Sequence, residues 1–236
     1  TVVFVGGISP QLEGEEMPIE ISGFKGGDRT NIELPKVQRN FLKALKEAGK
    51  KVVYVNCSGS AIALTPETES CDAILQAWYP GQEGGEAVAR VLFGEYNPVG
   101  KLPVTFYKNS EQLPDFKDYS MKGRTYRYMN DALFPFGYGL SYTSFRMGDA
   151  TLSNSILKKG EKITLKVPVS NVGKKDGTEV VQVYVKDPAD TDGPLKTLKA
   201  FERVEVKAGK TAEAVITLDS SNFELFDAAT NTVRAK

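Results

Sequence analysis

Apolar positions in the first part of the chain, up to about residue 107, follow two alternating patterns. The run 1–6 is a continuous stretch rich in β-branched residues, a pattern typical of a strand buried on both faces. The segments 51–55 and 72–78 predict two more strands, whereas 35–49 and 83–93 repeat apolar residues at helical spacing. Strands and helices that alternate with short connections predict an α/β layer with a mainly parallel sheet.

The two predicted helices have recognisable ends and apolar faces. Pro35 lies near the first turn of one helix and Gly49 ends it. The inward-facing residues are expected to be Val37, Phe41, Leu42 and Leu45 in the first helix, and Ala87, Val88, Val91 and Leu92 in the second. The elements are too few for a complete doubly wound domain. This count and the start within an apolar run favour an interior piece of a longer polypeptide; a processed N-terminus tucked into a sheet is the alternative.

From about residue 146 onward, the apolar positions alternate with a period of two. The segments 162–169, 179–185 and 211–218 show this alternation, and turn-forming Gly, Asp, Asn and Pro residues separate them. Short alternating strands at regular intervals predict a small antiparallel β-sandwich.

Between these two parts, segment 108–145 has no clean period and is unusually aromatic. Ten aromatic residues lie in or next to it: Tyr107, Phe116, Tyr119, Tyr126, Tyr128, Phe134, Phe136, Tyr138, Tyr142 and Phe145. We interpret the segment as an irregular connector whose aromatic side chains pack on neighbouring domains. A platform on which sugars stack is the alternative. The predicted domain limits are therefore 1–107, 108–145 and 146–236.

Composition narrows the chemistry that this chain can perform. Thirty basic residues balance thirty acidic ones, so net charge gives no reason to expect nucleic acid or an anionic membrane as a partner. No apolar run approaches the roughly 18 residues of a membrane span. The absence of histidine excludes histidine-based catalysis within the chain and leaves carboxylates as the natural acid/base groups. Cys57 and Cys71 do not indicate the cellular compartment of the protein, and they could form a disulfide with each other or remain free.

The densest cluster of acidic residues follows the first predicted strand. Glu13, Glu15 and Glu16 lie in a glycine-containing loop, and Asp28 and Arg29 follow a second pair of glycines. Such a loop at the carboxyl end of a strand is a candidate site. The glutamates could supply a general acid/base, oxygen ligands for Ca²⁺ or Mg²⁺, or only a solvated acidic loop. The local sequence alone favours the solvated loop.

Two neighbouring features admit a structural and a functional interpretation. We expect Arg29 to hold the loop against the sheet through a bidentate pair with a carboxylate, in preference to contacting substrate. The glycine-rich stretch 81–85 precedes a predicted helix and could bind an anion. It lacks the spacings of dinucleotide and Walker motifs, so a nucleotide-binding α/β protein is a weaker hypothesis.

Several long motifs together resemble family 3 glycoside hydrolases. The resemblance to the second domain of that family is carried by 78–85 (Trp-Tyr-Pro-Gly-Gln-Glu-Gly-Gly), 91–106, 124–128 and 134–142. The all-β part is similar to the family's fibronectin type III-like domain, through 169–173 and 177–184. The resemblance implies part of an α/β sandwich with a mainly parallel sheet, followed by a fibronectin type III-like β-sandwich. It extends over essentially the whole chain.

The family resemblance also implies an activity and a division of the catalytic groups. It implies retaining hydrolysis of β-linked sugars from non-reducing ends, with a nucleophilic aspartate on a preceding (β/α)₈ barrel that this chain does not contain. The general acid/base then corresponds to Glu13, with Glu15 second and Glu16 third, ahead of the family's Gly-Asp-Arg at residues 27–29. No cofactor and no metal are expected.

The substrate and partners follow from the same resemblance. Segment 7–15 is most similar to the β-xylosidase branch, so xylo-oligosaccharides are the preferred substrate and a β-glucosidase is the alternative. The expected partners are the oligosaccharide, the barrel of the same polypeptide and a possible second copy. The expected location is periplasmic or extracellular. A carbohydrate-binding or scaffold module without catalysis is the alternative from another class.

Overall fold

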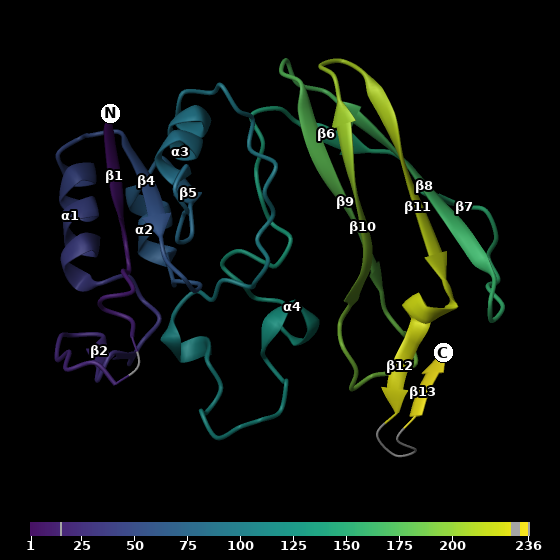
Figure 1. Cartoon of the computed structure of the whole chain (residues 1–236), viewed down its shortest axis with the longest axis horizontal. Helices are drawn as coiled ribbons and strands as arrows, with labels where there is room; N and C mark the ends of the chain where they lie inside the picture. Colours follow the sequence, from purple (N-terminus) through teal and green to yellow (C-terminus); the bar gives the residue numbers. More distant parts are fainter. Residues whose placement is uncertain (15, 228–231, 236) are drawn as a thin grey trace. The chain divides into compact units, whose positions relative to one another are not determined.

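The computed structural model describes residues 1–14, 16–227 and 232–235. The chain divides into two compact units (Figure 1). The first unit contains Thr1–Phe93 and Pro103–Phe136, and the second contains Gly94–Leu102 and Gly137–Lys236. Each unit has its own sheet system, as the change of apolar pattern predicts. Within the described ranges, no helix is both long and apolar enough to cross a membrane.

A three-stranded parallel sheet forms the centre of the first unit. Its strands are β1 (Val2–Gly7), β4 (Val52–Cys57) and β5 (Ala73–Gln76), in the order β1-β4-β5. β1 pairs with β4 in parallel register, and β4 pairs with β5 in the same sense. The predicted parallel α/β layer is confirmed. As a consequence, the loops that leave all three strands begin at the same edge of the sheet.

Helix α1 (Lys36–Glu47) packs against β1, β4 and α2 (Thr65–Ser70). It begins directly after Pro35 and is followed by Gly49, as its sequence predicts. Leu42 is its fully buried residue, and the core beneath it includes Val52, Tyr54, Ile62 and Leu64. Burial of such side chains is the main favourable term in folding, at about 25 cal/mol per Å² of apolar surface.

Helix α2 is not evident from the apolar pattern because its residues are nearly all polar. Its buried residue is Glu67, whose carboxylate accepts hydrogen bonds from Arg39 of α1, from Nε at 2.7 Å and from Nη2 at 3.2 Å. A buried carboxylate is tolerated when a bidentate arginine compensates for its lost hydration. The two helices are therefore joined by an ion pair rather than by an apolar stripe.

The predicted burial of strand β1 is wrong. The strand is not buried on both faces, because Val3 and Val5 are 49% and 63% exposed. It lies at one edge of the sheet in the described part of the chain, and α1 covers the face that carries Phe4. One face of β1 is therefore in the core and the other is not.

The predicted inward faces of two helices are also partly exposed. Val37 and Phe41 of α1 are 76% and 49% exposed, although helical spacing places them inward. Helix α3 (Gly84–Leu92) has no buried residue, and its Ala87 is exposed. Helical spacing identifies an apolar face, but the extent of its burial depends on the elements that cover it.

The second unit is built from antiparallel strands. One sheet contains β6 (Phe145–Met147), β8 (Lys162–Asn171) and β11 (Thr211–Asp219), with β7 (Thr151–Leu152) also paired to β8. The other contains β9 (Gly177–Val185) and β10 (Thr197–Val206). The hairpin β12 (Glu224–Asp227) and β13 (Thr232–Ala235) follows the short helix η2 (Ser220–Phe223).

Alternating residues from both sheets form one apolar core in this unit. Its buried members are Ile163, Val167, Val169, Val181, Val204, Val206, Ala214, Ile216 and Leu218. The register explains the selection: Val167 pairs with Ala214 and Val169 with Ala212, so the inward positions of β8 meet those of β11. The predicted β-sandwich is confirmed.

The aromatic segment is divided between the two units at Gly137. In the first unit, the buried Phe106 contacts the rings of Trp78 and Phe134. The segment also forms the short helices η1 (Ser110–Gln112) and α4 (Thr125–Tyr128). Two of its aromatic residues, Phe116 and Tyr119, are more than 90% exposed. The domain limits inferred from the sequence remain a proposal.

Candidate active site

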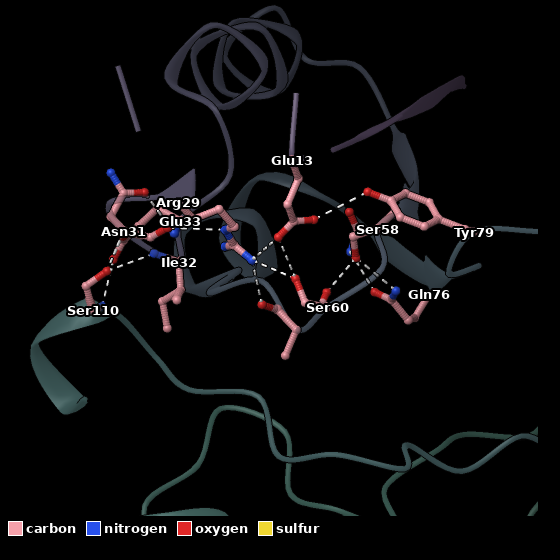
Figure 2. A network of polar contacts seen from close by, with 12 residues as sticks. Glu13, Arg29, Asn31, Ile32, Glu33, Ser58, Ser60, Gln76, Tyr79 and Ser110 are labelled. Carbon is pink, nitrogen blue, oxygen red and sulfur yellow. Dashed lines mark hydrogen bonds and ion pairs between the residues drawn. The ribbon is translucent and has the colours of Figure 1, made fainter. Parts of the chain in front are cut away.

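The candidate site lies where the three parallel strands of the first unit end. Glu13 is on the loop after β1, Ser58 and Ser60 follow β4, and Tyr79 follows β5 (Figure 2). Because these strands are parallel, residues far apart in the sequence meet at one edge of the sheet. The position is the one that the α/β pattern predicts for a ligand site.

The carboxylate of Glu13 has a partner on each oxygen. Its Oε1 accepts a hydrogen bond from the Ser60 hydroxyl at 3.1 Å, and its Oε2 accepts one from the Tyr79 hydroxyl at 3.4 Å. Arg29 Nη1 lies 3.6 Å from Oε1. The Glu13 side chain is 24% exposed, so it is held by the protein and still reached by solvent. Figure 2 shows it between the Arg29–Ser60 pair and Tyr79.

Arg29 is held in place mainly by neutral groups. It is the last residue of β3 (Asp28–Arg29), which pairs with β2 (Phe24–Lys25), and its side chain is only 11% exposed. It donates to the Ser60 hydroxyl at 2.9 Å and to the carbonyls of Asn31 and Ala61 at 3.2 and 3.3 Å. Burial lowers the pKa of Arg29, and the charge of Glu13 opposes that shift. The guanidinium remains protonated at working pH.

The Arg29–Glu13 pair differs from the bidentate pair that the sequence suggested. A single nitrogen, Nη1, approaches a single carboxylate oxygen, at a distance longer than a hydrogen bond. Ser60 Oγ lies closer to Nη1, at 2.9 Å, than Glu13 does. Arg29 does hold the loop against the sheet, but through a bridging hydroxyl.

The loop that carries Glu13 depends on a close approach between two glycines. A Cβ atom on Gly27 would lie 1.6 Å from the carbonyl oxygen of Gly14, the residue after Glu13. Gly27 also has a φ of +88°, a conformation that L side chains rarely adopt. On the other side of the loop, the side-chain amide of Gln38 binds the backbone N–H and carbonyl of Gly7, at 2.8 and 2.7 Å. Both ends of the loop are therefore fixed.

A buried polar network supports the Ser60 side of the site. Asn56 donates to Gln76 Oε1 at 2.6 Å and to the Ser58 hydroxyl at 3.3 Å, and it accepts a hydrogen bond from Tyr54 at 2.7 Å. Gln76 donates to Ser58 at 3.2 Å, and Ser58 donates to the Ser60 carbonyl at 2.8 Å. Asn56 and Ser58 are fully buried, so these contacts replace hydration that both groups have lost.

Tyr79 approaches the candidate carboxylate from the opposite side. Burial raises the pKa of Tyr79, and the negative charge of Glu13 adds to the shift, so the phenol remains a neutral donor at physiological pH. Its ring lies against Gly59, where an added Cβ would come within 2.6 Å of Tyr79 Cε2. The preceding residue, Trp78, has a φ of 58°, an uncommon conformation that often marks functional segments.

The other acidic residues of the predicted cluster do not join Glu13. Asp28 and Glu16 are exposed, and Glu15 lies outside the described residues. Glu33, which was not part of that predicted cluster, accepts hydrogen bonds from the Ser110 N–H at 2.8 Å and the Ser110 hydroxyl at 2.7 Å. Burial works to raise the pKa of Glu33, but the Ser110 hydrogen bonds outweigh burial and lower it overall. This carboxylate connects two loops of the first unit.

Other candidate features of the sequence gain little from the structure. Over the described ranges, no group of three or more Asp, Glu, Cys or His side chains is arranged to hold a metal ion. A cavity of about 360 Å³ borders Arg29 and Glu33, but its lining does not include Glu13. Cys57 and Cys71 are free thiols, and burial raises the pKa of both, that of Cys71 to about 11.

Ser60 and Tyr79 are the site residues that sequence reasoning missed. Tyr79 lies within the motif 78–85, directly after the predicted strand 72–78. This position at the end of a strand was the available sign that Tyr79 belongs to the site. Ser60 is part of an unremarkable Ser-Gly-Ser stretch after β4. Only the parallel pairing of β1 and β4 reveals that this stretch faces Glu13.

Comparison with known proteins identifies the family. Residues 1–142 match the family model described as the glycosyl hydrolase family 3 C-terminal domain. The chain belongs to glycoside hydrolase family 3. Residues 179–236 match the fibronectin type III-like domain, which covers the part of the β-sandwich from β9 onward in this family 3 chain. Both parts of the resemblance found in the sequence are confirmed.

Named relatives of this family 3 chain include xylosidases and glucosidases. A xylan 1,4-β-xylosidase of Xylanibacter ruminicola is 66% identical over 235 residues, covering 100% of this chain and 27% of the relative. A periplasmic β-glucosidase of Salmonella typhimurium is 41% identical, over 84% of this chain and 28% of the relative. A β-glucosidase from Listeria innocua, solved with glucose, superposes with a TM-score of 0.81 at 30% identity, over 99% of this chain and 33% of that one. The chain thus spans about a third or less of these relatives.

Proposed function

We propose that this chain supplies the general acid/base, Glu13, of a retaining β-glycosidase that removes sugars from the non-reducing ends of oligosaccharides. In the first step, a carboxylate nucleophile from another part of the polypeptide bonds to the anomeric carbon, while Glu13 gives its proton to the departing glycosidic oxygen. In the second step, the Glu13 carboxylate takes a proton from water, and the resulting nucleophile releases the sugar from the enzyme.

The surroundings of Glu13 carry this proposal. An acid/base must exist in both protonation states during each turnover, so it needs partners that tolerate both. Two hydroxyl groups contact the carboxylate, and the Arg29 guanidinium is 3.6 Å away. The carboxylate is partly exposed at the loop edge of the sheet, where a ligand can reach it. The exposed Glu16 has none of these features among the contacts described.

The nucleophile belongs to another part of the polypeptide in this proposal. Retaining glycosidases place their two carboxyl groups about 5–5.5 Å apart. This chain matches only 27–33% of the full length of the three relatives compared above. A preceding (β/α)₈ barrel with a nucleophilic aspartate would complete the site, and the barrel is therefore the intramolecular partner that we propose for this loop edge.

We favour β-1,4-xylo-oligosaccharides as substrate. The relative with 66% identity is named a xylan 1,4-β-xylosidase, and the similarity includes the Glu13 loop. A β-glucosidase is the alternative, supported by the Salmonella relative and the Listeria structure with glucose. The ratio of kcat/KM for aryl β-xyloside to aryl β-glucoside decides between them. The Salmonella relative is named periplasmic, which supports a periplasmic or extracellular location.

The dependence on leaving group tests the role of Glu13. In the full-length protein, we expect Glu13→Gln to lower kcat on xylobiose about 10²–10⁴-fold, since the poor leaving group needs a proton. Formation of the glycosyl-enzyme from 2,4-dinitrophenyl xyloside should change far less, because that leaving group departs without protonation. Glu16→Gln, in the same loop and exposed, is the matched control and should retain normal rates. Unchanged xylobiose turnover in Glu13→Gln would refute the assignment.

A further inference from the structure

The hydroxyl of Ser60 occupies a bridging position between two charged groups. Arg29 Nη1 donates to Ser60 Oγ at 2.9 Å, and Ser60 Oγ donates to Glu13 Oε1 at 3.1 Å. The direct distance from Nη1 to Oε1 is longer, at 3.6 Å. In Figure 2 the three groups form a triangle in which Ser60 makes the two short contacts. Ser60 thus mediates the interaction between guanidinium and carboxylate.

The position of Ser60 is imposed by the strands beneath it. Ser58 donates to the carbonyl of Ser60 and accepts hydrogen bonds from Asn56 and Gln76, so its hydroxyl uses its donor and both acceptor sites. These two amides come from the adjacent strands β4 and β5, where Asn56 and Gln76 are register partners. A fully satisfied buried network of this kind is rigid. The backbone of Ser60 is therefore held in place, with its hydroxyl next to Glu13.

A hydroxyl suits a carboxyl group that changes protonation. Ser60 can donate to ionised Glu13, and after protonation its remaining acceptor site can receive the proton of the carboxylic acid. A guanidinium cannot reverse in this way because it has donors only. A direct arginine pair would stabilise the ionised form and oppose proton delivery. The charged and titratable groups facing Glu13 are Arg29 and Tyr79, with Glu33 near Arg29.

We propose that Ser60 is a positioning residue, which holds Glu13 Oε1 in place and keeps Arg29 Nη1, now 3.6 Å away, from approaching it to hydrogen-bond distance. This inference rests on the proposed role of Glu13 as general acid/base. Ser60 itself exchanges no proton with substrate. Its removal should leave Arg29 and Glu13 free to approach each other, which withdraws the carboxyl from its working position and favours its ionised form.

The test compares Ser60→Ala, Ser60→Cys and Ser60→Thr in the full-length protein. We expect Ser60→Ala and Ser60→Cys to lower kcat/KM on xylobiose about 10-fold to 100-fold, the range expected for a misplaced catalytic group. The alkaline limb of the pH–kcat/KM profile should move to lower pH, since an ion-paired Glu13 loses its proton more easily. Ser60→Thr retains the hydroxyl and should restore both rate and profile. The rate at which 2,4-dinitrophenyl xyloside forms the glycosyl-enzyme should change little in these variants, because that leaving group departs without protonation.

Two outcomes separate this inference from the function on which it rests. If Glu13→Gln leaves xylobiose turnover intact, the proposed function fails irrespective of Ser60. If Glu13→Gln behaves as an acid/base variant but Ser60→Ala and Ser60→Cys keep the wild-type rate and pH profile, the Ser60 inference is overturned. A rate loss in both variants without a shift of the alkaline limb, or without rescue by Ser60→Thr, also contradicts it. Thermal unfolding confirms that each variant is folded.

Discussion

Among the residues that the structure describes, each unit buries one asparagine almost completely, and the two asparagines support different features. Asn56 lies within the parallel sheet of the first unit, and its contacts lead through Ser58 to the segment that holds Glu13. Asn171 lies at the end of β8 in the second unit, where it donates to the carbonyls of Lys175 and Val206. Polar burial in the second unit therefore stabilises a turn, whereas in the first unit it supports a candidate site.

Glycines provide the largest expected effect in this comparison. Gly27→Ala introduces a Cβ into the carbonyl of Gly14, so it should displace the Glu13 loop and lower catalytic efficiency about 100-fold or more. Gly209→Ala in the second unit also changes a residue with positive φ, but nothing lies within 4 Å of its new Cβ. We expect Gly209→Ala to lower the free energy of unfolding by about 1 kcal/mol and to leave the catalytic activity unchanged. Equal kinetic effects in the two full-length variants would contradict this contrast.

The two buried asparagines give the next largest effect. Replacing either with leucine leaves buried partners without hydrogen bonds, at a cost of about 1–3 kcal/mol of unfolding free energy. Only Asn56→Leu should also lower kcat/KM, by about 10-fold, because it weakens the hydrogen-bond network that holds Ser60 in place. Asn171→Leu should keep normal kinetics below its unfolding temperature. Calorimetry and steady-state kinetics of the full-length variants measure both properties, and a kinetic defect in Asn171→Leu would break the comparison.

Two surface aspartates, Asp72 and Asp219, provide the smallest effect, which should not differ between the units. The Val52 N–H, with Lys46, lowers the pKa of Asp72 in the first unit, and the hydroxyl and N–H of Ser221 lower the pKa of Asp219 in the second. A carboxylate with a lowered native pKa stabilises the fold above its unfolded value, about 3.9, and this contribution disappears as pH falls through the native value. Asp72→Asn and Asp219→Asn should each flatten the loss of Tm below about pH 4. A change of Tm confined to neutral pH would contradict the lowered pKa of these two aspartates.

Much of the fold could be predicted from sequence because local patterns determine it. The alternation in 162–169 predicted strand β8, and the structure buries its Ile163, Val167 and Val169. The limits of helix α1 were equally clear from its ends. Helix α2 was not, because an ion pair to its buried Glu67 replaces the apolar stripe. The exposure of Val3 and Val5 depends on sheet order, which strand composition does not encode.

The candidate site was only partly predictable. The loop after the first strand was recognisable, but local sequence favoured a solvated acidic loop, and the family resemblance selected Glu13. The partners Ser60 and Tyr79 come from loops 47 and 66 residues away along the chain. Their approach to Glu13 follows from parallel strand pairing, a tertiary feature.

The central claim is that Glu13 is the acid/base of a retaining glycosidase. The most direct test is the product that full-length Glu13→Ala forms from 2,4-dinitrophenyl β-xyloside with and without sodium azide. Azide is an anionic nucleophile that needs no general base, so it should accelerate turnover and yield β-xylosyl azide, which NMR identifies by its anomeric configuration. If azide neither accelerates the reaction nor gives the β-azide while the variant is folded, Glu13 is not the acid/base.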